Sequence, residues 1–177
     1  MIVCAGRTEY LSFAHPIGVG LIEVAMNLTQ LALFDKPEFL LFVGTAGSYG
    51  EHDIFDIIES RGASQIEHCF WKKGCYTPLD NVITSEGMNV SHETLINSSN
   101  YITTDPSVWP YFTKQGITAE NMEFFALLQV AKEHNIPAGG IFIVTNHCDE
   151  NAHETYKANL KEALQRLERY VMEKFSL

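Results

Sequence analysis

The sequence predicts an α/β protein in which a largely parallel sheet lies between helices. Short apolar runs, of the length of strands, alternate with longer segments in which apolar residues recur at helical spacing. The strongest apolar runs are continuous, which is typical of parallel strands covered on both faces. The length of 177 residues, without internal repeats or linker-like stretches, predicts one domain over residues 1–177.

The first part of the chain predicts two strands separated by a helix. Residues 1–5 form an apolar run that ends at Gly6, so they predict a buried strand. Residues 18–34 place apolar side chains at helical spacing and predict a helix. Residues 39–43 are apolar throughout and predict a central strand, which we expect to stop at a turn formed by Gly44-Thr45-Ala46-Gly47-Ser48.

The remaining elements follow from the same patterns. Strands are predicted at residues 54–59, 65–70, 81–85 and 140–145, helices at 121–135 and 152–175, and a loop with little regular structure at 97–115. This alternation of strands and helices favours a largely parallel sheet.

Composition limits the classes of partner. The formal charge of −10 argues against non-specific nucleic-acid binding and against docking on an anionic membrane, although a local nest of amides could still hold one phosphate. No run is apolar for long enough to cross a membrane, and the N-terminus lacks the pattern of a signal peptide. We therefore expect a cytoplasmic protein with no nucleic-acid or membrane partner.

The cysteines and histidines do not predict a metal site. We interpret the four cysteines as reduced thiols: Cys4, Cys69, Cys75 and Cys148. Cys69 and Cys75 are too far apart for a zinc-type pair. Several possible ligands lie between His147 and His153, but their spacing matches no known ligand pattern, so we interpret this segment as a loop and expect no metal.

Three segments are expected to meet at one edge of the sheet. They are residues 5–7, 44–47 and 145–147, each at the carboxyl end of a predicted strand. Ligands of open α/β sheets bind beyond the carboxyl ends of the strands, so this convergence is the predicted site. In residues 44–47, glycines would let the backbone approach a ligand and Thr45 would add a hydroxyl; the alternative is a tight turn without a ligand.

Five further residues could carry chemistry, and each also has a plain structural interpretation. Arg7 could clamp a phosphate and Glu9 could bind a sugar hydroxyl or a water, or the two could form a solvated surface pair. Glu123 could accept two ribose hydroxyls with Met122 under the sugar, or it could simply favour a helix start. Asn146 could read the edge of a 6-oxopurine, or it could cap a strand end.

The order of these segments carries a family resemblance. A glycine ends the first strand, Val43-Gly44-Thr45-Ala46-Gly47 ends the next, Asn121-Met122-Glu123 opens a helix, and Val144-Thr145-Asn146 ends a later strand. In this order the chain resembles the nucleoside phosphorylase and nucleosidase superfamily, which includes purine nucleoside phosphorylases and methylthioadenosine/adenosylhomocysteine nucleosidases. The resemblance implies a three-layer α-β-α sandwich with a central, mostly parallel mixed sheet, a homo-oligomer, and cleavage of the N-glycosidic bond of nucleosides by phosphate or water.

The resemblance also implies a role for each matching position. The residues implied to bind the nucleoside are Thr45, Ala46, Gly47, Met88 and Met122; those implied to bind phosphate are Gly6, Arg7 and Thr45; and those implied to be catalytic are Glu9, Glu123 and Asn146. In this scheme Glu123 fixes the ribose hydroxyls, and Met88 is an apolar wall over the base. Glu9 orients the nucleophile if that nucleophile is water.

Two departures from the family shape the expected function. The chain is shorter than most members, and we expect a strand or hairpin to be missing before the helix at Gly18. Thr145-Asn146 replaces the usual Ser-Asp; an Asn cannot be a general acid, but the trimeric branch of purine nucleoside phosphorylases uses one in a Thr-Asn context. The sequence therefore predicts phosphorolysis of 6-oxopurine nucleosides, with phosphate as co-substrate and no other cofactor. A hydrolytic nucleosidase and a non-catalytic nucleoside-binding protein are the alternatives.

Overall fold

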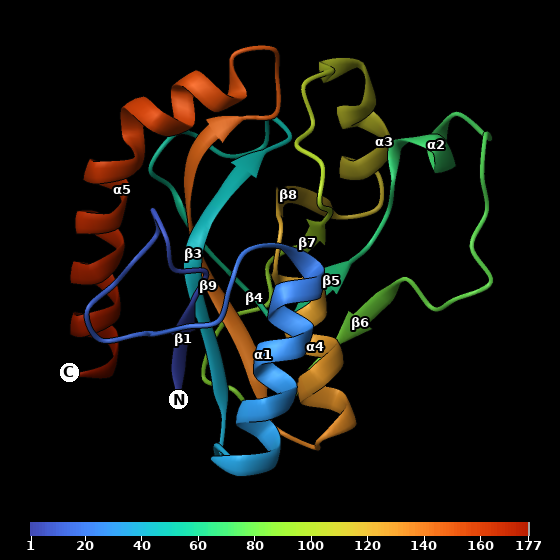
Figure 1. The fold of residues 1–177 in the computed structure, drawn as a ribbon. Helices are drawn as coiled ribbons and strands as arrows, with labels where there is room; N and C mark the ends of the chain where they lie inside the picture. The colour runs from blue at the N-terminus through green and yellow to red at the C-terminus, as the bar shows by residue number, and fades with distance from the viewer. Residues whose placement is uncertain (177) are drawn as a thin grey trace.

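β3 and β9 form the centre of a mixed sheet in a computed structural model that describes residues 1–176 (Figure 1). β3 (Leu40–Ser48) and β9 (Ala138–His147) run parallel over nearly their whole length. The other strands of this sheet in the described chain are β1 (Ile2–Cys4), β2 (His15–Pro16), β4 (Ile57–Ser60), β5 (Gly62–Ser64), β6 (Val82–Thr84), β7 (Leu95–Ser98) and β8 (Ile117–Asn121).

Helices cover both faces of the central strands. The helices are α1 (Gly20–Phe34), α2 (His68–Trp71), α3 (Trp109–Thr113), α4 (Phe124–Glu133) and α5 (Ala152–Phe175), with a 3-10 turn at Pro106–Val108. α5 packs against β9 and β3 on one side of the sheet, while α1 and α4 lie side by side on the other (Figure 1). The predicted three-layer sandwich with a mixed central sheet is therefore confirmed.

The two faces of β3 show why a continuous apolar run forms this strand. Leu40 and Phe42 pack into the core beneath α1 and α4, whereas Leu41 and Val43 pack into the core beneath α5. Because successive side chains of a strand point to opposite faces, only a run that is apolar at every position can fill both cores.

Strand directions bring distant segments together at one end of β3. β1 and β9 pair with β3 in parallel, so their carboxyl ends lie at the same edge. β8 pairs with the end of β3 in the antiparallel direction, with Gly47 opposite Glu120. The segment that leaves β8 therefore runs back alongside Ala46 and Thr45, which carries Met122 and Glu123 to the predicted site.

The predicted glycine-rich turn is wrong, because residues 44–48 are the second half of β3 and are buried. At these positions glycine is required by close packing and not by a turn. A Cβ on Gly44 would lie 2.7 Å from the ring of Phe42, and a Cβ on Gly47 would lie 2.9 Å from the sulfur of Cys148. A side chain at either position would have to displace one of these neighbours, so glycine fits there without rearrangement.

Other differences fall where local patterns are weak. Residues 65–70 are not a strand, since they end in α2. The predicted loop at 97–115 contains the end of β7, the 3-10 turn and α3, and β8 just after it was not predicted. Before α1, β2 and a turn closed by the Glu9 N–H on the Gly6 carbonyl at 2.9 Å occupy the region where a strand or hairpin was expected to be missing. β5 and β7 were also not predicted, whereas β1, α1, β4, β6, α4, β9 and α5 were predicted within a few residues of their bounds.

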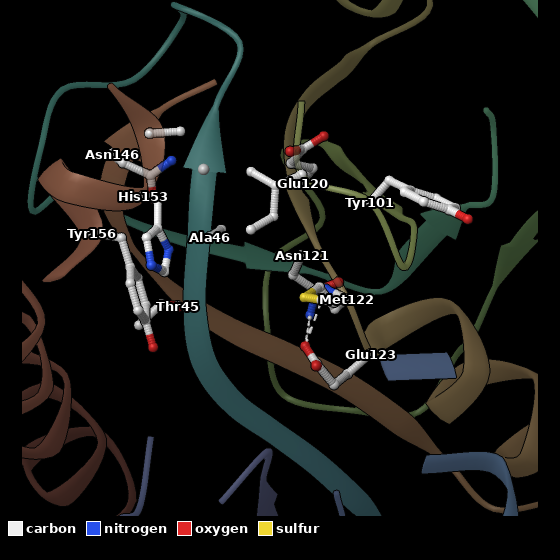
Figure 2. A pocket seen from close by; sticks show the side chains of 13 residues that line it. Thr45, Ala46, Tyr101, Glu120, Asn121, Met122, Glu123, Asn146, His153 and Tyr156 are labelled. Carbon is white, nitrogen blue, oxygen red and sulfur yellow. Dashed lines mark hydrogen bonds between the residues drawn. The ribbon is translucent and has the colours of Figure 1, made fainter. Parts of the chain in front are cut away.

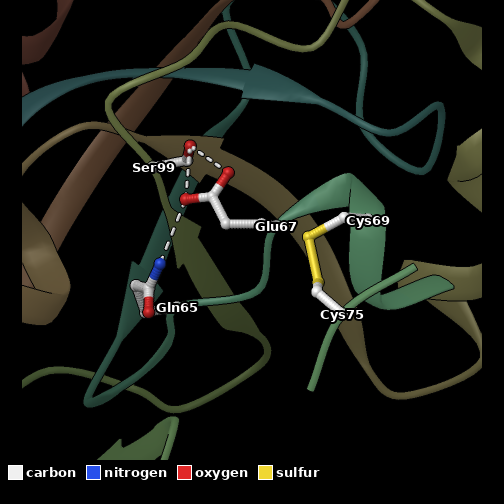
Figure 3. Close-up of a disulfide and its surroundings, with 5 residues drawn as sticks. All are labelled: Gln65, Glu67, Cys69, Cys75 and Ser99. Carbon is white, nitrogen blue, oxygen red and sulfur yellow. Dashed lines mark hydrogen bonds between the residues drawn. A yellow bond between two sulfur atoms is a disulfide. The ribbon is translucent and has the colours of Figure 1, made fainter. Parts of the chain in front are cut away.

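The interpretation of all four cysteines as reduced thiols is wrong for two of them. Cys69 and Cys75 form a disulfide beside α2, while Cys4 and Cys148 are free and buried (Figure 3). The chain reverses between the two bonded residues, where the N–H of Gly74 donates to the carbonyl of Cys69 at 2.8 Å. Within residues 1–176, no helix is long and apolar enough to span a membrane.

Candidate active site

A cavity opens beyond the carboxyl ends of β3 and β9, where the sequence analysis predicted a site (Figure 2). Its lining comes from β3 (Thr45, Ala46, Gly47), from β8 and the start of α4 (Glu120, Asn121, Met122, Glu123), from the end of β9 (Asn146), from α5 (Ala152, His153, Tyr156) and from Tyr101 and Ile102. Among the residues that the structure describes, no Lys or Arg lines this cavity. The cavity is therefore acidic and suits a neutral or cationic ligand better than an anion.

Glu9 lies behind Thr45, in the loop that follows β1. Its Oε2 accepts the backbone N–H of Thr45 at 3.0 Å, and its Oε1 accepts the Thr45 hydroxyl at 2.8 Å. Burial raises the pKa of Glu9 above its usual value, and the hydrogen bonds from Thr45 act in the opposite direction.

Glu123 is the residue before the first turn of α4, and 6% of it is exposed. Its carboxylate accepts the backbone N–H groups of Gly20 at 3.0 Å and Met122 at 3.1 Å. Gly20 reaches it from the start of α1 with a φ of +84°, a conformation that glycine adopts without strain. Burial, and then the charge of Glu9, raise the pKa of Glu123 to about 7. Glu123 therefore lines the cavity, and the carboxylate of Glu9 behind Thr45 lies close enough for its charge to act on Glu123.

Asn146 ends the buried part of β9 and faces the space above Gly47. Its Oδ1 accepts the Thr145 hydroxyl at 2.9 Å, and its Nδ2 donates to the carbonyl of His147 at 3.0 Å. A Cβ on Gly47 would lie 3.0 Å from Nδ2, so the glycine keeps the amide accessible from the cavity. An amide nitrogen carries two N–H groups, so Asn146 can still offer one to a ligand.

Glu120 lines the cavity although no pattern in the sequence predicts it. Its carboxylate accepts the N–H of Thr103 at 2.8 Å, the hydroxyl of Thr103 at 2.6 Å and the hydroxyl of Tyr49 at 2.6 Å. These bonds fix the segment that carries Tyr101 and Ile102 against β8, although both side chains stay largely exposed at the cavity mouth. No local signal marks Glu120, because its partners Thr103 and Tyr49 come from two separate segments.

Four residues predicted for the site do not line the cavity: Gly6, Arg7, Met88 and Glu9, which lies behind Thr45. The guanidinium of Arg7 is exposed and pairs with Glu23. Gly6 forms a turn with a φ of +83° behind the cavity wall. Met88 packs against Gly139 at the beginning of β9, whereas the cavity lies at the other end of that strand, so the prediction that Met88 covers the base is wrong. Thr45, Ala46, Gly47, Met122, Glu123 and Asn146 do line the cavity.

Comparison with known proteins places this geometry among related folds. The model of a family described as the phosphorylase superfamily matches residues 72–175. A 5'-methylthioadenosine/S-adenosylhomocysteine nucleosidase of Helicobacter pylori, with butyl-thio-DADMe-Immucillin-A, is similar in structure with a TM-score of 0.81 at 14% identity, over 99% of this chain and 96% of that one. No curated protein matches the chain.

Two further solved structures are similar. The futalosine hydrolase of Helicobacter pylori strain 26695 has a TM-score of 0.79 at 15% identity, over 96% of this chain and 94% of that one. The MTA/SAH nucleosidase of Streptococcus pneumoniae, in complex with 8-aminoadenine, has a TM-score of 0.76 at 16% identity, over 97% of this chain and 96% of that one. At these identities the likeness establishes the fold.

Proposed function

The chain belongs to the phosphorylase superfamily, and from that premise we propose that it is a hydrolytic purine nucleosidase. In this reaction water replaces the purine at the anomeric carbon of the sugar, which gives free base and free ribose. The observation that carries the proposal is the position of Glu9, whose carboxylate already accepts the N–H and the hydroxyl of Thr45.

The occupied donors of Thr45 argue against phosphate as the nucleophile. A phosphate at this place would need those donors and a nearby cation. Instead it would meet the carboxylates of Glu9 and Glu123, and the guanidinium of Arg7 is paired with Glu23. Like charges repel strongly in a buried site, so water is the better nucleophile here. The names of the structural neighbours, nucleosidases and a hydrolase, also support this choice.

The other lining residues have roles that follow from their chemistry. Cleavage passes through a sugar with developing positive charge, which the carboxylates of Glu9 and Glu123 would stabilise. Glu123 would also hold ribose hydroxyls in position, and Glu9 would orient the water. The ring of Tyr101 could stack on the base at the cavity mouth. The amide of Asn146 would stabilise the negative charge that develops on O6 and N7 of a departing 6-oxopurine.

The test is to incubate the purified protein with inosine, guanosine, adenosine and methylthioadenosine, with and without phosphate. We expect free base and free ribose from at least one nucleoside without phosphate. Release of base only when phosphate is added, together with ribose 1-phosphate, would instead establish the phosphorylase that the sequence predicted. Binding of a nucleoside with no release of base would indicate the non-catalytic alternative.

The homo-oligomer implied by the family resemblance stays a prediction. α1 presents large apolar side chains to solvent, since Ile22 is 69% exposed and Met26 is 63% exposed. Both lie on one face of the helix, four residues apart, so a second copy could cover them. Sedimentation velocity measures the oligomeric state of the wild type and of Met26→Glu, which should dissociate. A monomeric wild type would contradict the prediction.

A further inference from the structure

Tyr156 is a cavity residue to which the proposed mechanism gives no role. It lies on α5, near the beginning of the helix, and lines the cavity beside Thr45 and His153 (Figure 2). Its phenol donates to Oε1 of Glu9 at 3.2 Å, and it lies 3.1 Å from the hydroxyl of Thr8. The phenol thus connects the C-terminal helix to a carboxylate that is 147 positions earlier in the chain.

Glu9 depends on such contacts because its own segment has little regular structure. It follows Arg7, which has a φ of 54°, in a turn that a single backbone hydrogen bond from Glu9 to Gly6 closes. The donors that fix the Glu9 carboxylate come from two other elements: Thr45 on β3 supplies two and Tyr156 on α5 supplies one. A side chain held from two directions loses the rotamer freedom that an acidic residue in a loop otherwise keeps.

We propose that Tyr156 is a positioning residue that holds Glu9 in the orientation required to direct water at the sugar. The inference rests on the proposed function, because it names a residue that serves the same reaction. It extends the site to α5, which packs on the opposite face of the sheet from α1 and α4. Tyr156 would act through Glu9 and would not touch the reacting atoms.

The charges around Glu9 allow this role to be tested by titration. The titratable groups that face Glu9 are Glu123 at the start of α4, Cys4 on β1 and Tyr156 on α5. The hydrogen bond from Tyr156 lowers the pKa of Glu9, against the larger effect of burial. Burial and then the charge of Glu9 raise the pKa of Tyr156 to about 12, so the phenol remains a donor throughout the physiological range.

The experiment compares Tyr156→Phe with Tyr170→Phe. Tyr170 is a matched control because it lies on the same helix and also donates to a carboxylate, Oε1 of Glu59 at 2.7 Å. It lies roughly 20 Å along the helix from Tyr156, at a rise of about 1.5 Å per residue. In both variants the aromatic ring stays and only a hydroxyl is lost, so packing is preserved.

The first measurement is the pKa of Glu9, obtained from a pH titration of its carboxyl carbon signal by NMR. The signal is assigned by its absence from the spectrum of Glu9→Gln. We expect the pKa of Glu9 to rise by about one unit in Tyr156→Phe, the size expected when a carboxylate loses one hydrogen bond, and to stay unchanged in Tyr170→Phe. An unchanged pKa in Tyr156→Phe would overturn the proposal. This measurement is decisive even for a protein that releases no base, in which case only the proposed function fails.

The second measurement is turnover of the nucleoside that the wild type cleaves fastest. We expect kcat of Tyr156→Phe to fall about tenfold, with KM little changed and with the acidic limb of the pH profile moved to higher pH. In the Glu9→Gln background the same substitution should have little further effect, because the group that Tyr156 positions is already lost. Equal losses in both backgrounds would show that Tyr156 acts independently of Glu9, and would overturn the proposal.

Discussion

Thr45 donates two hydrogen bonds to the carboxylate of Glu9, from its backbone N–H at 3.0 Å and from its hydroxyl at 2.8 Å. Removing the charge from this carboxylate tests whether it orients a water. We expect Glu9→Gln to lower kcat by about 100-fold, within the range that general bases contribute. The fold should persist, because the glutamine Oε1 can still accept from Thr45.

Glu23→Gln is the control for Glu9→Gln. Glu23 is another acidic residue of this region, but its carboxylate pairs with Arg7 on the surface and accepts the N–H of Val19, whereas Glu9 binds Thr45 of the cavity wall. Its loss should leave kcat within about twofold of the wild type, as is usual for surface substitutions. Equal turnover of Glu9→Gln and the wild type would rule out the assigned role of Glu9.

A second prediction concerns Glu123 and turnover. Its carboxylate is fixed by the N–H groups of Gly20 and Met122, so it is pre-organised to receive ribose hydroxyls. Glu123→Ala should lower kcat/KM by about 100-fold or more, since positioning of this kind contributes several kcal/mol. Steady-state kinetics and circular dichroism of the same sample separate this loss from unfolding. A folded variant with near wild-type kcat/KM would remove Glu123 from the site.

The raised pKa of Glu123 predicts how stability depends on pH. The folded protein holds the proton of Glu123 up to about pH 7, whereas the unfolded chain releases it near the ordinary value of 4.5. The folded state therefore binds more protons between these values, so the free energy of unfolding falls as pH rises from 4.5 to 7 and levels off above. The size of the loss is about 3 kcal/mol, at 1.36 kcal/mol per pKa unit.

Glu123→Gln is the variant that isolates this effect, because it keeps the shape of the side chain and removes the titration. Urea unfolding at pH 5 and pH 8 should show a larger loss of stability for the wild type than for the variant. Glu9 is present in both proteins, so the part of its contribution that does not depend on the charge of Glu123 cancels in the comparison. Parallel pH profiles would contradict the buried, protonated state of Glu123.

The fold could be predicted where apolar residues form a continuous run or recur at helical spacing. β3, β9, α1, α4 and α5 were all found from apolar runs or helical stripes, and these elements build the core. β8 could not be found in this way, because its Thr118, Glu120 and Asn121 are polar side chains that are satisfied only by partners far along the chain. The prediction of a turn at residues 44–48 failed for another reason. The glycines there avoid clashes with Phe42 and Cys148, and the sequence alone does not reveal these neighbours.

The site was predictable to the extent that it lies on these regular elements. Thr45 and Asn146 lie at the carboxyl ends of apolar runs and Glu123 precedes a helix, so topology alone brings them together. The residue type of Arg7 does not tell whether it binds phosphate or forms a surface ion pair. Only the tertiary structure shows that it is exposed and pairs with Glu23. Tyr156 was missed because a tyrosine near the start of an amphipathic helix carries no mark of a contact 147 positions away.

A further prediction concerns the choice of base. The Nδ2 of Asn146 can donate to the O6 and N7 edge of a 6-oxopurine, whereas an ionised aspartate would repel that edge and a protonated one could donate a proton to N7 of adenine. Asn146→Asp should therefore raise the ratio of adenosine to inosine cleavage by about tenfold, the size expected of one hydrogen bond to a base. Asn151→Asp is the control, because Asn151 is exposed just before α5 and does not line the cavity. An unchanged ratio would count against the role of Asn146 at the base.

The last prediction concerns the disulfide, which is linked to the cavity wall. α2 and the residue before it hold the segment around Tyr101. The ring of His68 lies 2.9 Å from the Thr103 hydroxyl, and the carboxylate of Glu67 accepts the Ser99 hydroxyl at 3.2 Å (Figure 3). The bond joins residues with a sequence separation of 6. Closing so short a loop lowers the entropy of the unfolded chain, so Cys75→Ser should reduce the free energy of unfolding by about 2 kcal/mol.

Urea unfolding with and without dithiothreitol checks this prediction. The reductant should destabilise the wild type by about the same 2 kcal/mol and should leave Cys75→Ser unchanged, since Cys4 and Cys148 are free thiols already. Because the same bond steadies the segment that carries Tyr101, KM for the nucleoside should rise in both reduced wild type and variant while kcat changes little. If mass spectrometry shows Cys69 and Cys75 fully reduced and the unfolding curve does not move, the disulfide does not stabilise this part of the fold.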